Sequence, residues 1–313
     1  MLDILAITFP IYAAILIGYG VVAKGWFSGA DMRTLGTYVL NIALPALLFK
    51  AVASRDLNEI FHPGYIAVFL VGGLATILVA YLWFTVTAPD AGRRAVATLG
   101  SSCPNSGFIG YPVMLLVFPD LAGVILALNF LVENIVLIPI CLILMDWAKG
   151  GAHAGLGVRI AMLLWGLVKR PMVIGLLLGL VVSMVNLPIP PPALRLLDML
   201  AASAAALSLV VIGGSLVGLP TKGNRALAGQ IAVGKLVLHP VLVGLALLAL
   251  PVAGLAVSPD LATAAVLSAA MPMFGIYAVL AQEQGLEGLA SLAMLIATSA
   301  AFVTLSVLLY ALT

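Results

Sequence analysis

The chain is dominated by long apolar runs that polar residues interrupt only at intervals. A membrane-spanning helix needs about 20 mostly apolar residues, and ten stretches meet this requirement. They are residues 4–23, 36–53, 64–86, 94–117, 121–146, 170–187, 196–217, 227–250, 261–282 and 288–311. Turn-forming or charged residues separate them, such as Pro63-Gly64 and Pro259-Asp260. The pattern predicts an all-α integral membrane protein with ten transmembrane helices.

Composition supports this class and excludes others. The 313 residues are 64% apolar and 8% charged, whereas soluble domains are about half apolar and about a quarter charged. So few charged residues could not form the polar surface of a soluble enzyme or of a nucleic-acid-binding protein. A chain this apolar is not a disordered protein either. An outer-membrane barrel would need alternating polar residues. Cys103 and Cys141 both lie inside apolar runs, so no disulfide framework is expected.

The distribution of basic residues predicts the topology. Cytoplasmic loops carry the excess of Lys and Arg. With both termini outside, ten basic residues fall on the cytoplasmic side and three outside, while Lys235 lies within a span. We therefore expect a multi-pass protein of the cell inner membrane with both termini outside. The start of the chain lacks a basic region ahead of its first apolar run, which predicts a retained span rather than a signal peptide.

A glycine-rich loop divides the chain into two halves. Residues 1–146 hold the first five spans, residues 147–169 form a cytoplasmic loop, and residues 170–313 hold the other five. An odd number of spans per half gives the halves opposite orientations. If the halves are homologous, the fold is an inverted repeat, as in many secondary transporters.

The fourth span of each half contains a matched interruption. Pro104 is followed by Gly107 in one, and Pro272 by Gly275 in the other. Proline removes a backbone donor and disturbs the preceding helical turn, and paired interruptions in corresponding spans indicate a substrate site. Two packing kinks are the simpler alternative. We expect two broken helices, spans 4 and 9, that cross each other.

Four motifs, in the same order along the chain, resemble the auxin efflux carrier family of membrane transporters, and in particular its bacterial members. They are Asn41-Ile-Ala-Leu-Pro45, Pro104-Asn105-Ser106-Gly107, Lys169-Arg170-Pro171 and Met271-Pro272 through Glu283. The resemblance implies the fold of bile acid:sodium symporters. Spans 1, 2, 6 and 7 would form a scaffold, often dimeric, and spans 3–5 and 8–10 a mobile transport core. It also implies malonate or malate as substrate and Asn105 as a polar site residue, whereas Met273 departs from the family pattern.

Two groups of residues are candidates for the chemistry. The substrate-binding group consists of Asn41, Pro104, Asn105, Ser106, Gly107, Pro272, Met273, Phe274 and Gly275. Free N–H groups at the helix breaks, near Ser106-Gly107 and Phe274-Gly275, could hold a carboxylate. The second group comprises Glu133, Asn129, Lys235 and His239, because charge within a bilayer is costly and indicates function.

The second group allows several roles. Glu133 could form an internal ion pair with Lys235 or His239, which share a helix face at spacing i, i+4. Alternatively, Glu133 and nearby Asn oxygens could hold Na⁺ or a proton, or Lys235 could replace a coupling cation permanently. No other metal site and no cofactor is expected.

These features together predict a permease rather than an enzyme. The expected partners are a small organic anion and the lipid bilayer, with no nucleic acid; a homodimer through the scaffold helices is left open. A sodium-coupled symporter of the bile-acid type is the nearest alternative. An intramembrane enzyme is disfavoured because the three histidines have no adjacent metal-type ligands. The small-residue pairs Gly175/Gly179 and Gly214/Gly218 indicate close helix packing or a dimer face.

Overall fold

The computed structural model describes residues 2–88, 90–150, 165–166, 168–219, 224–250 and 254–312. Within these ranges the chain is built of helices, without a β-strand, and one isolated antiparallel bridge joins Pro104 to Met273. The all-α class expected from the apolar runs is therefore confirmed. Most of the predicted central loop (residues 151–164 and 167) lies outside the described residues, and so does the predicted cytoplasmic Lys222.

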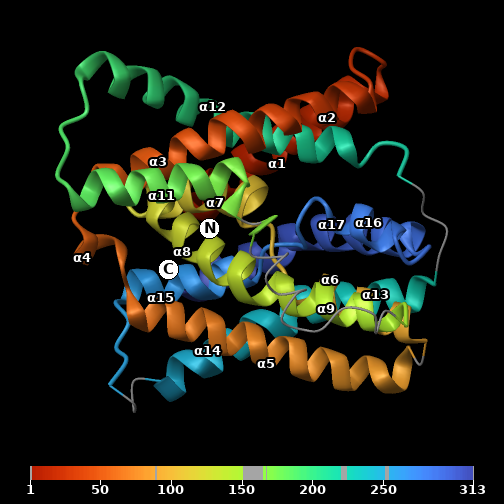
Figure 1. Cartoon of the computed structure of the whole chain (residues 1–313). Helices are drawn as coiled ribbons and strands as arrows, with labels where there is room; N and C mark the ends of the chain where they lie inside the picture. Colours follow the sequence, from red (N-terminus) through yellow and green to blue (C-terminus); the bar gives the residue numbers. More distant parts are fainter. Residues whose placement is uncertain are drawn as a thin grey trace. The chain divides into compact units, whose positions relative to one another are not determined.

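Figure 1 shows the course of the chain. The first half contains α1 (Leu2–Ala23), α2 (Gly29–Tyr38), η1 (Val39–Ala43), α3 (Leu44–Ala53), α4 (Leu57–Ile60), α5 (Pro63–Thr87), α6 (Ala91–Ser102), η2 (Ser106–Gly110), α7 (Tyr111–Val117), α8 (Ala122–Val132), η3 (Glu133–Leu137) and α9 (Ile138–Ala148). The second half contains α11 (Pro171–Met184), α12 (Pro191–Ser215), α13 (Arg225–Val233), η4 (Gly234–Leu238), α14 (His239–Ala249), α15 (Pro259–Ala269), α16 (Tyr277–Gln282) and α17 (Glu287–Leu312). The η segments are π-helical turns.

Six helices within the described residues are long and apolar enough to cross a membrane. Three come from each half: Gly29–Ala53, Pro63–Thr87 and Ala122–Ala148, then Pro191–Ser215, Arg225–Ala249 and Glu287–Leu312. Three shorter apolar helices are Thr8–Ala23, Ser106–Val117 and Pro171–Met184. A multi-pass membrane protein is therefore confirmed.

The second span begins earlier than the apolar pattern indicated. The expected start was residue 36, but the helix begins at Gly29 because Ser28 and Asp31 form a capping box. The Ser28 hydroxyl accepts from the Asp31 N–H at 3.2 Å, and the Ser28 N–H donates to the Asp31 carboxylate at 2.7 Å. These bonds satisfy the otherwise unpaired amides of the first turn, so a polar turn extends the apolar span.

The described chain divides into two compact units. The first comprises residues 1–62, 107–128 and 164–218, and the second comprises residues 63–106, 129–163 and 219–313. In the first unit α1 packs along α12, and α3 along α11. Glycines make these contacts close: a methyl group on Gly175 would lie 2.5 Å from the Pro45 carbonyl oxygen, and one on Gly179 would lie 2.7 Å from that of Phe49. The predicted small-residue pair on this span thus serves packing within the chain.

The second unit is held together by α5, which packs against α6 and α14, and by the pairing of α13 with α17. Glycines again allow close approach, because a methyl group on Gly72 would lie 2.5 Å from the Val243 side chain. Most of the buried polar side chains of the described residues lie in this unit, including Glu133, Lys235 and His239.

Each of the four π-helical segments ends two residues before a proline. The prolines are Pro45, Pro112, Pro139 and Pro240, each the second residue of the α-helix that follows. Proline has no N–H to donate to the carbonyl four residues earlier, and the helix responds by widening. In three segments the next residue donates its N–H to the carbonyl five residues back: Leu44 to Val39, Ile138 to Glu133 and His239 to Gly234.

Candidate functional site

The two proline–glycine interruptions are joined within the second unit. Helix α6 ends at Ser102 and α15 ends at Ala269, and the extended segments that follow meet at the Pro104–Met273 bridge. The Asn105 N–H donates to the Pro272 carbonyl at 2.8 Å, and the Phe274 N–H donates to the Cys103 carbonyl at 3.3 Å. The predicted breaks and their mutual approach are therefore confirmed.

The crossing changes which amides are available to a ligand. The Phe274 N–H, expected to face an anion, is used by the Cys103 carbonyl instead. Helical structure resumes at Ser106 on one side of the crossing and at Tyr277 on the other. The first amides of a helix lack intrahelical partners, so the amides that begin the apolar helix Ser106–Val117 could still hold an anion.

Glu133 lies beside the crossing. Its side chain is 4% exposed and accepts a hydrogen bond of 2.5 Å from the Ser106 hydroxyl. Ser106 is the first residue after the broken segment, and Glu133 is the first residue of η3. The carboxylate is therefore tied directly to the end of the crossing, at a position where the helix is widened.

Asn129 connects three helices one turn before Glu133. It accepts from the Tyr65 hydroxyl at 2.6 Å and donates to the Ser268 hydroxyl at 2.9 Å. These partners lie on α5 and on α15, the half-helix that leads into the second break. The sequence pattern indicated Asn129 but not Tyr65 or Ser268. A lone tyrosine or serine in an apolar span is too common a feature to have indicated them.

Lys235 and His239 contact each other as their i, i+4 spacing predicts. Lys235 Nζ lies 2.9 Å from His239 Nδ1 and also donates to the Ala269 carbonyl, the last residue of α15. Both residues are fully buried. Because the ammonium can only donate, Nδ1 accepts and the ring proton belongs on Nε2. Among the described residues, this buried Nε2 has no hydrogen-bond partner.

Glu133 and Lys235 are near one another without forming an ion pair. They are close enough to attract each other electrostatically. Yet the salt bridges found in the described part of the chain are Lys50–Asp198 and Lys149–Glu283. The two opposite charges thus sit in one buried network, each held by hydrogen bonds to other groups. Such an arrangement partly compensates the cost of burying charge.

Each π-helical segment carries one of the predicted polar residues. Asn41 lies in η1, Ser106 in η2, Glu133 in η3 and Lys235 in η4. A π-turn inserts one extra residue per turn, which rotates side chains out of the regular helical register, and such turns are common at functional sites. These segments were not predicted; a polar residue four to six positions before a proline in an apolar span is the sequence signal that could have indicated them.

The remaining predicted residues are distributed differently. Pro104, Asn105, Pro272 and Met273 are buried in the second unit, where Phe274 is half-buried and Gly275 is exposed. Asn41 and Gly107 belong to the first unit. Within the described residues, no three His, Cys, Asp or Glu side chains converge as a metal site would require.

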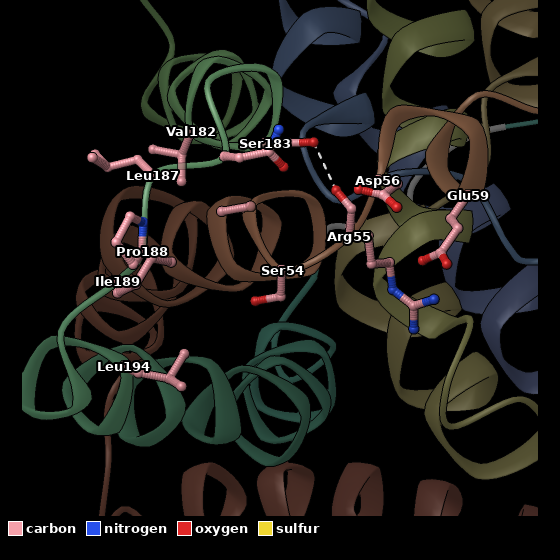
Figure 2. Close-up of a pocket in the computed structure, with 12 residues that line it drawn as sticks. Ser54, Arg55, Asp56, Glu59, Val182, Ser183, Leu187, Pro188, Ile189 and Leu194 are labelled. Atoms are coloured by element: carbon pink, nitrogen blue, oxygen red, sulfur yellow. Dashed lines mark hydrogen bonds between the residues drawn. The ribbon is translucent and has the colours of Figure 1, made fainter.

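A separate pocket of about 450 Å³ lies in the first unit, and none of the predicted site residues lines it. Figure 2 shows Arg55, Asp56 and Glu59 toward one end and Leu187, Pro188 and Ile189 toward the other. The Ser183 hydroxyl donates to the Arg55 carbonyl at 2.6 Å, which ties α11 to the end of α3. Two carboxylates beside one guanidinium give the polar end an acidic balance, which does not suit an anion.

Broken helices that meet within a bundle of apolar spans define a membrane transport protein as a class. The comparison with protein families agrees: residues 4–309 match the family described as "Membrane transport protein". The chain belongs to this family, and the resemblance to auxin efflux carriers read from the motifs is confirmed.

Similar proteins carry transporter names. The chain is 29% identical over 320 residues to a protein of Rhizobium meliloti named "Putative malonate transporter", covering 99% of this chain and 96% of that protein. It is 28% identical over 280 residues to an "Uncharacterized transporter" of Methanothermobacter thermautotrophicus, covering 87% and 86%. It is also 28% identical over 191 residues to the "Uncharacterized transporter YfdV" of Escherichia coli K12, covering 58% of each.

Proposed function

We propose that this protein is a permease that moves a small organic anion, a carboxylate such as malonate or malate, across the inner membrane by alternating access. The crossing of the two broken helices carries the proposal. Non-helical backbone inside a membrane is tolerated only where protein or a water-filled cavity satisfies it. Here two backbone hydrogen bonds satisfy part of it, and buried polar residues surround the remainder.

Carboxylate selectivity follows from the chemistry of the crossing. Asn105 is buried there, and the amides that begin the helix Ser106–Val117 carry partial positive charge. These groups would bind an anion without an arginine. The name of the Rhizobium relative supports malonate as the first substrate to test.

Each of the two inverted halves would contribute helices both to a fixed scaffold and to a moving core. The matching lengths of corresponding spans support the inverted repeat: Gly29–Ala53 and Pro191–Ser215 have 25 residues each, as do Pro63–Thr87 and Arg225–Ala249. The first compact unit contains the proposed scaffold helices α1, α3, α11 and α12, together with residues 107–128 of the proposed core. An elevator mechanism would move most of the second unit against the scaffold.

Lys235 supports transport without sodium. Its ammonium donates to the Ala269 carbonyl and attracts Glu133, contacts that a bound cation would otherwise make. We propose that this fixed cation takes the place of a coupling ion. The sodium-coupled alternative predicts that uptake stops when Na⁺ is replaced by choline.

The proposed dimer would not use the helix surfaces that carry the small-residue pairs. Gly175, Gly179 and Gly214 are already occupied by neighbours within the chain. Exposed apolar side chains on the scaffold helices, such as Leu178 and Met199, remain for contact with lipid or a second copy.

Uptake into proteoliposomes tests the function directly. Vesicles containing the purified protein should accumulate labelled malonate, with competition from malate and less from acetate, in sodium or choline buffer alike. Protein-free vesicles and vesicles with Lys235→Met are the controls. Equal uptake by protein-free vesicles would refute the proposal, and strict dependence on Na⁺ would favour the symporter alternative.

A further inference from the structure

The chain has two cysteines, and the fold brings them together. Cys103 directly follows α6, Cys141 lies in α9, and both are fully buried in the second unit. The Ser102 hydroxyl lies 3.8 Å from the Cys103 sulfur and 3.5 Å from the Cys141 sulfur. The two thiols therefore flank one buried hydroxyl. The proposed transport mechanism uses neither thiol.

We propose that these thiols form a binding site for one soft, two-coordinate metal ion, of the class of Hg²⁺, Ag⁺ or Cu⁺. Thiolates select soft metals. With metal–sulfur bonds of about 2.3 Å, a linear bridge places the sulfurs roughly 4.6 Å apart, a spacing open to two thiols that flank one hydroxyl. A four-coordinate Zn²⁺ site would need two more ligands, and the described residues gather no third Cys, His, Asp or Glu.

The binding step is an exchange of protons for metal. Two S–H bonds break and two metal–sulfur bonds form; two protons leave, and neither metal nor sulfur changes oxidation state. With Hg²⁺ the bridge is neutral, which suits full burial. With Ag⁺ or Cu⁺ the bridge carries one negative charge, and Lys235 lies within electrostatic reach of Cys103 to compensate it.

The position of Cys103 gives the site a consequence. Cys103 immediately precedes Pro104, and its carbonyl accepts the Phe274 N–H at the crossing. A metal bridge to Cys141 would pin this end of the crossing to α9. This consequence rests on the proposed function: if the crossing moves or flexes during transport, the occupied site stops uptake.

Titration of the purified full-length protein with HgCl₂ tests the site. We expect one ion per chain, a sulfur-to-mercury absorption band in the ultraviolet, and protection of both cysteines from alkylation at one equivalent. Cys103→Ser and Cys141→Ser should each weaken binding at least 100-fold. Ser102→Ala is the matched control, because it keeps both thiols and should bind as the wild type does.

The wild-type measurements decide the proposal even if a cysteine variant fails to fold. Protection of one cysteine only, a requirement for two equivalents, or undiminished binding by a folded single variant would overturn the site. Uptake separates the two proposals: HgCl₂ should stop malonate uptake by the wild type and spare a Cys103→Ser/Cys141→Ser protein. If HgCl₂ binds without stopping uptake, the idea that the metal bridge immobilises the crossing is wrong, but the metal site stands. If untreated vesicles show no uptake, the proposed function is wrong, and the titration result still stands.

Discussion

The two compact units are stabilised by different means. In the first, helices pack backbone to backbone: Gly18 lies against the Val210 carbonyl, Gly213 against the Ile15 carbonyl, and the Lys50–Asp198 ion pair is 41% and 47% exposed. In the second, a carboxylate, an ammonium and an imidazole are buried together with serine, asparagine and tyrosine hydrogen bonds. Apolar helices can associate through small residues alone, so the costly polar groups of the second unit call for a functional explanation.

The largest effect is expected from removing the buried ammonium. Lys235→Met leaves Glu133 without its nearby positive charge and the Ala269 carbonyl without its donor. A buried charge left uncompensated costs about 3–5 kcal/mol, so the melting temperature should fall markedly and uptake should cease. The double variant Lys235→Met/Glu133→Gln should recover much of the stability. If the single variant is as stable as the wild type, the two charges are not coupled.

A smaller effect is expected from overpacking the first unit. A methyl group on Gly18 would collide with the Val210 backbone, whereas one on Gly20, in the same helix, would meet nothing within 4 Å. Gly18→Ala should therefore destabilise the protein by about 1–3 kcal/mol, while Gly20→Ala should not. Thermal unfolding of both variants in detergent checks this. Equal melting temperatures would show that α1 and α12 are not closely packed.

Asn105→Ala should affect ligand binding more than folding. Loss of one hydrogen bond to the carboxylate costs about 1 kcal/mol, or roughly a five-fold weaker affinity. Isothermal titration with malonate measures the affinity, and the melting temperature without ligand serves as the control for folding. Wild-type affinity in the variant would remove Asn105 from the site.

The smallest effect is expected at the surface of the second unit. Lys149 pairs with Glu283 at 2.8 Å, but their side chains are 37% and 58% exposed. Exposed pairs contribute less than about 1 kcal/mol. Lys149→Gln should thus leave stability nearly unchanged, in contrast to Lys235→Met within the same unit. A loss of stability as large as that of Lys235→Met would show that burial is not what distinguishes the two lysines.

The sequence by itself determined the class of protein, most span positions and the two breaks. Apolar runs must be buried in lipid or protein whatever their arrangement, and proline interrupts a helix through its own covalent structure. The spans expected at 64–86 and 288–311 are accordingly found as Pro63–Thr87 and Glu287–Leu312. The start of the second span was missed because a local capping box, not hydrophobicity, fixes it.

Only the tertiary structure decided which polar groups became partners. The sequence marked Glu133, Asn129 and Lys235 as unusual. It could not show that Glu133 accepts from Ser106, that Asn129 joins Tyr65 to Ser268, or that Ser102 lies against Cys141. Each of these contacts joins residues far apart in the chain. Their geometry depends on how helices pack and on the extra residue in each π-turn, which rotates a side chain toward one neighbour rather than another.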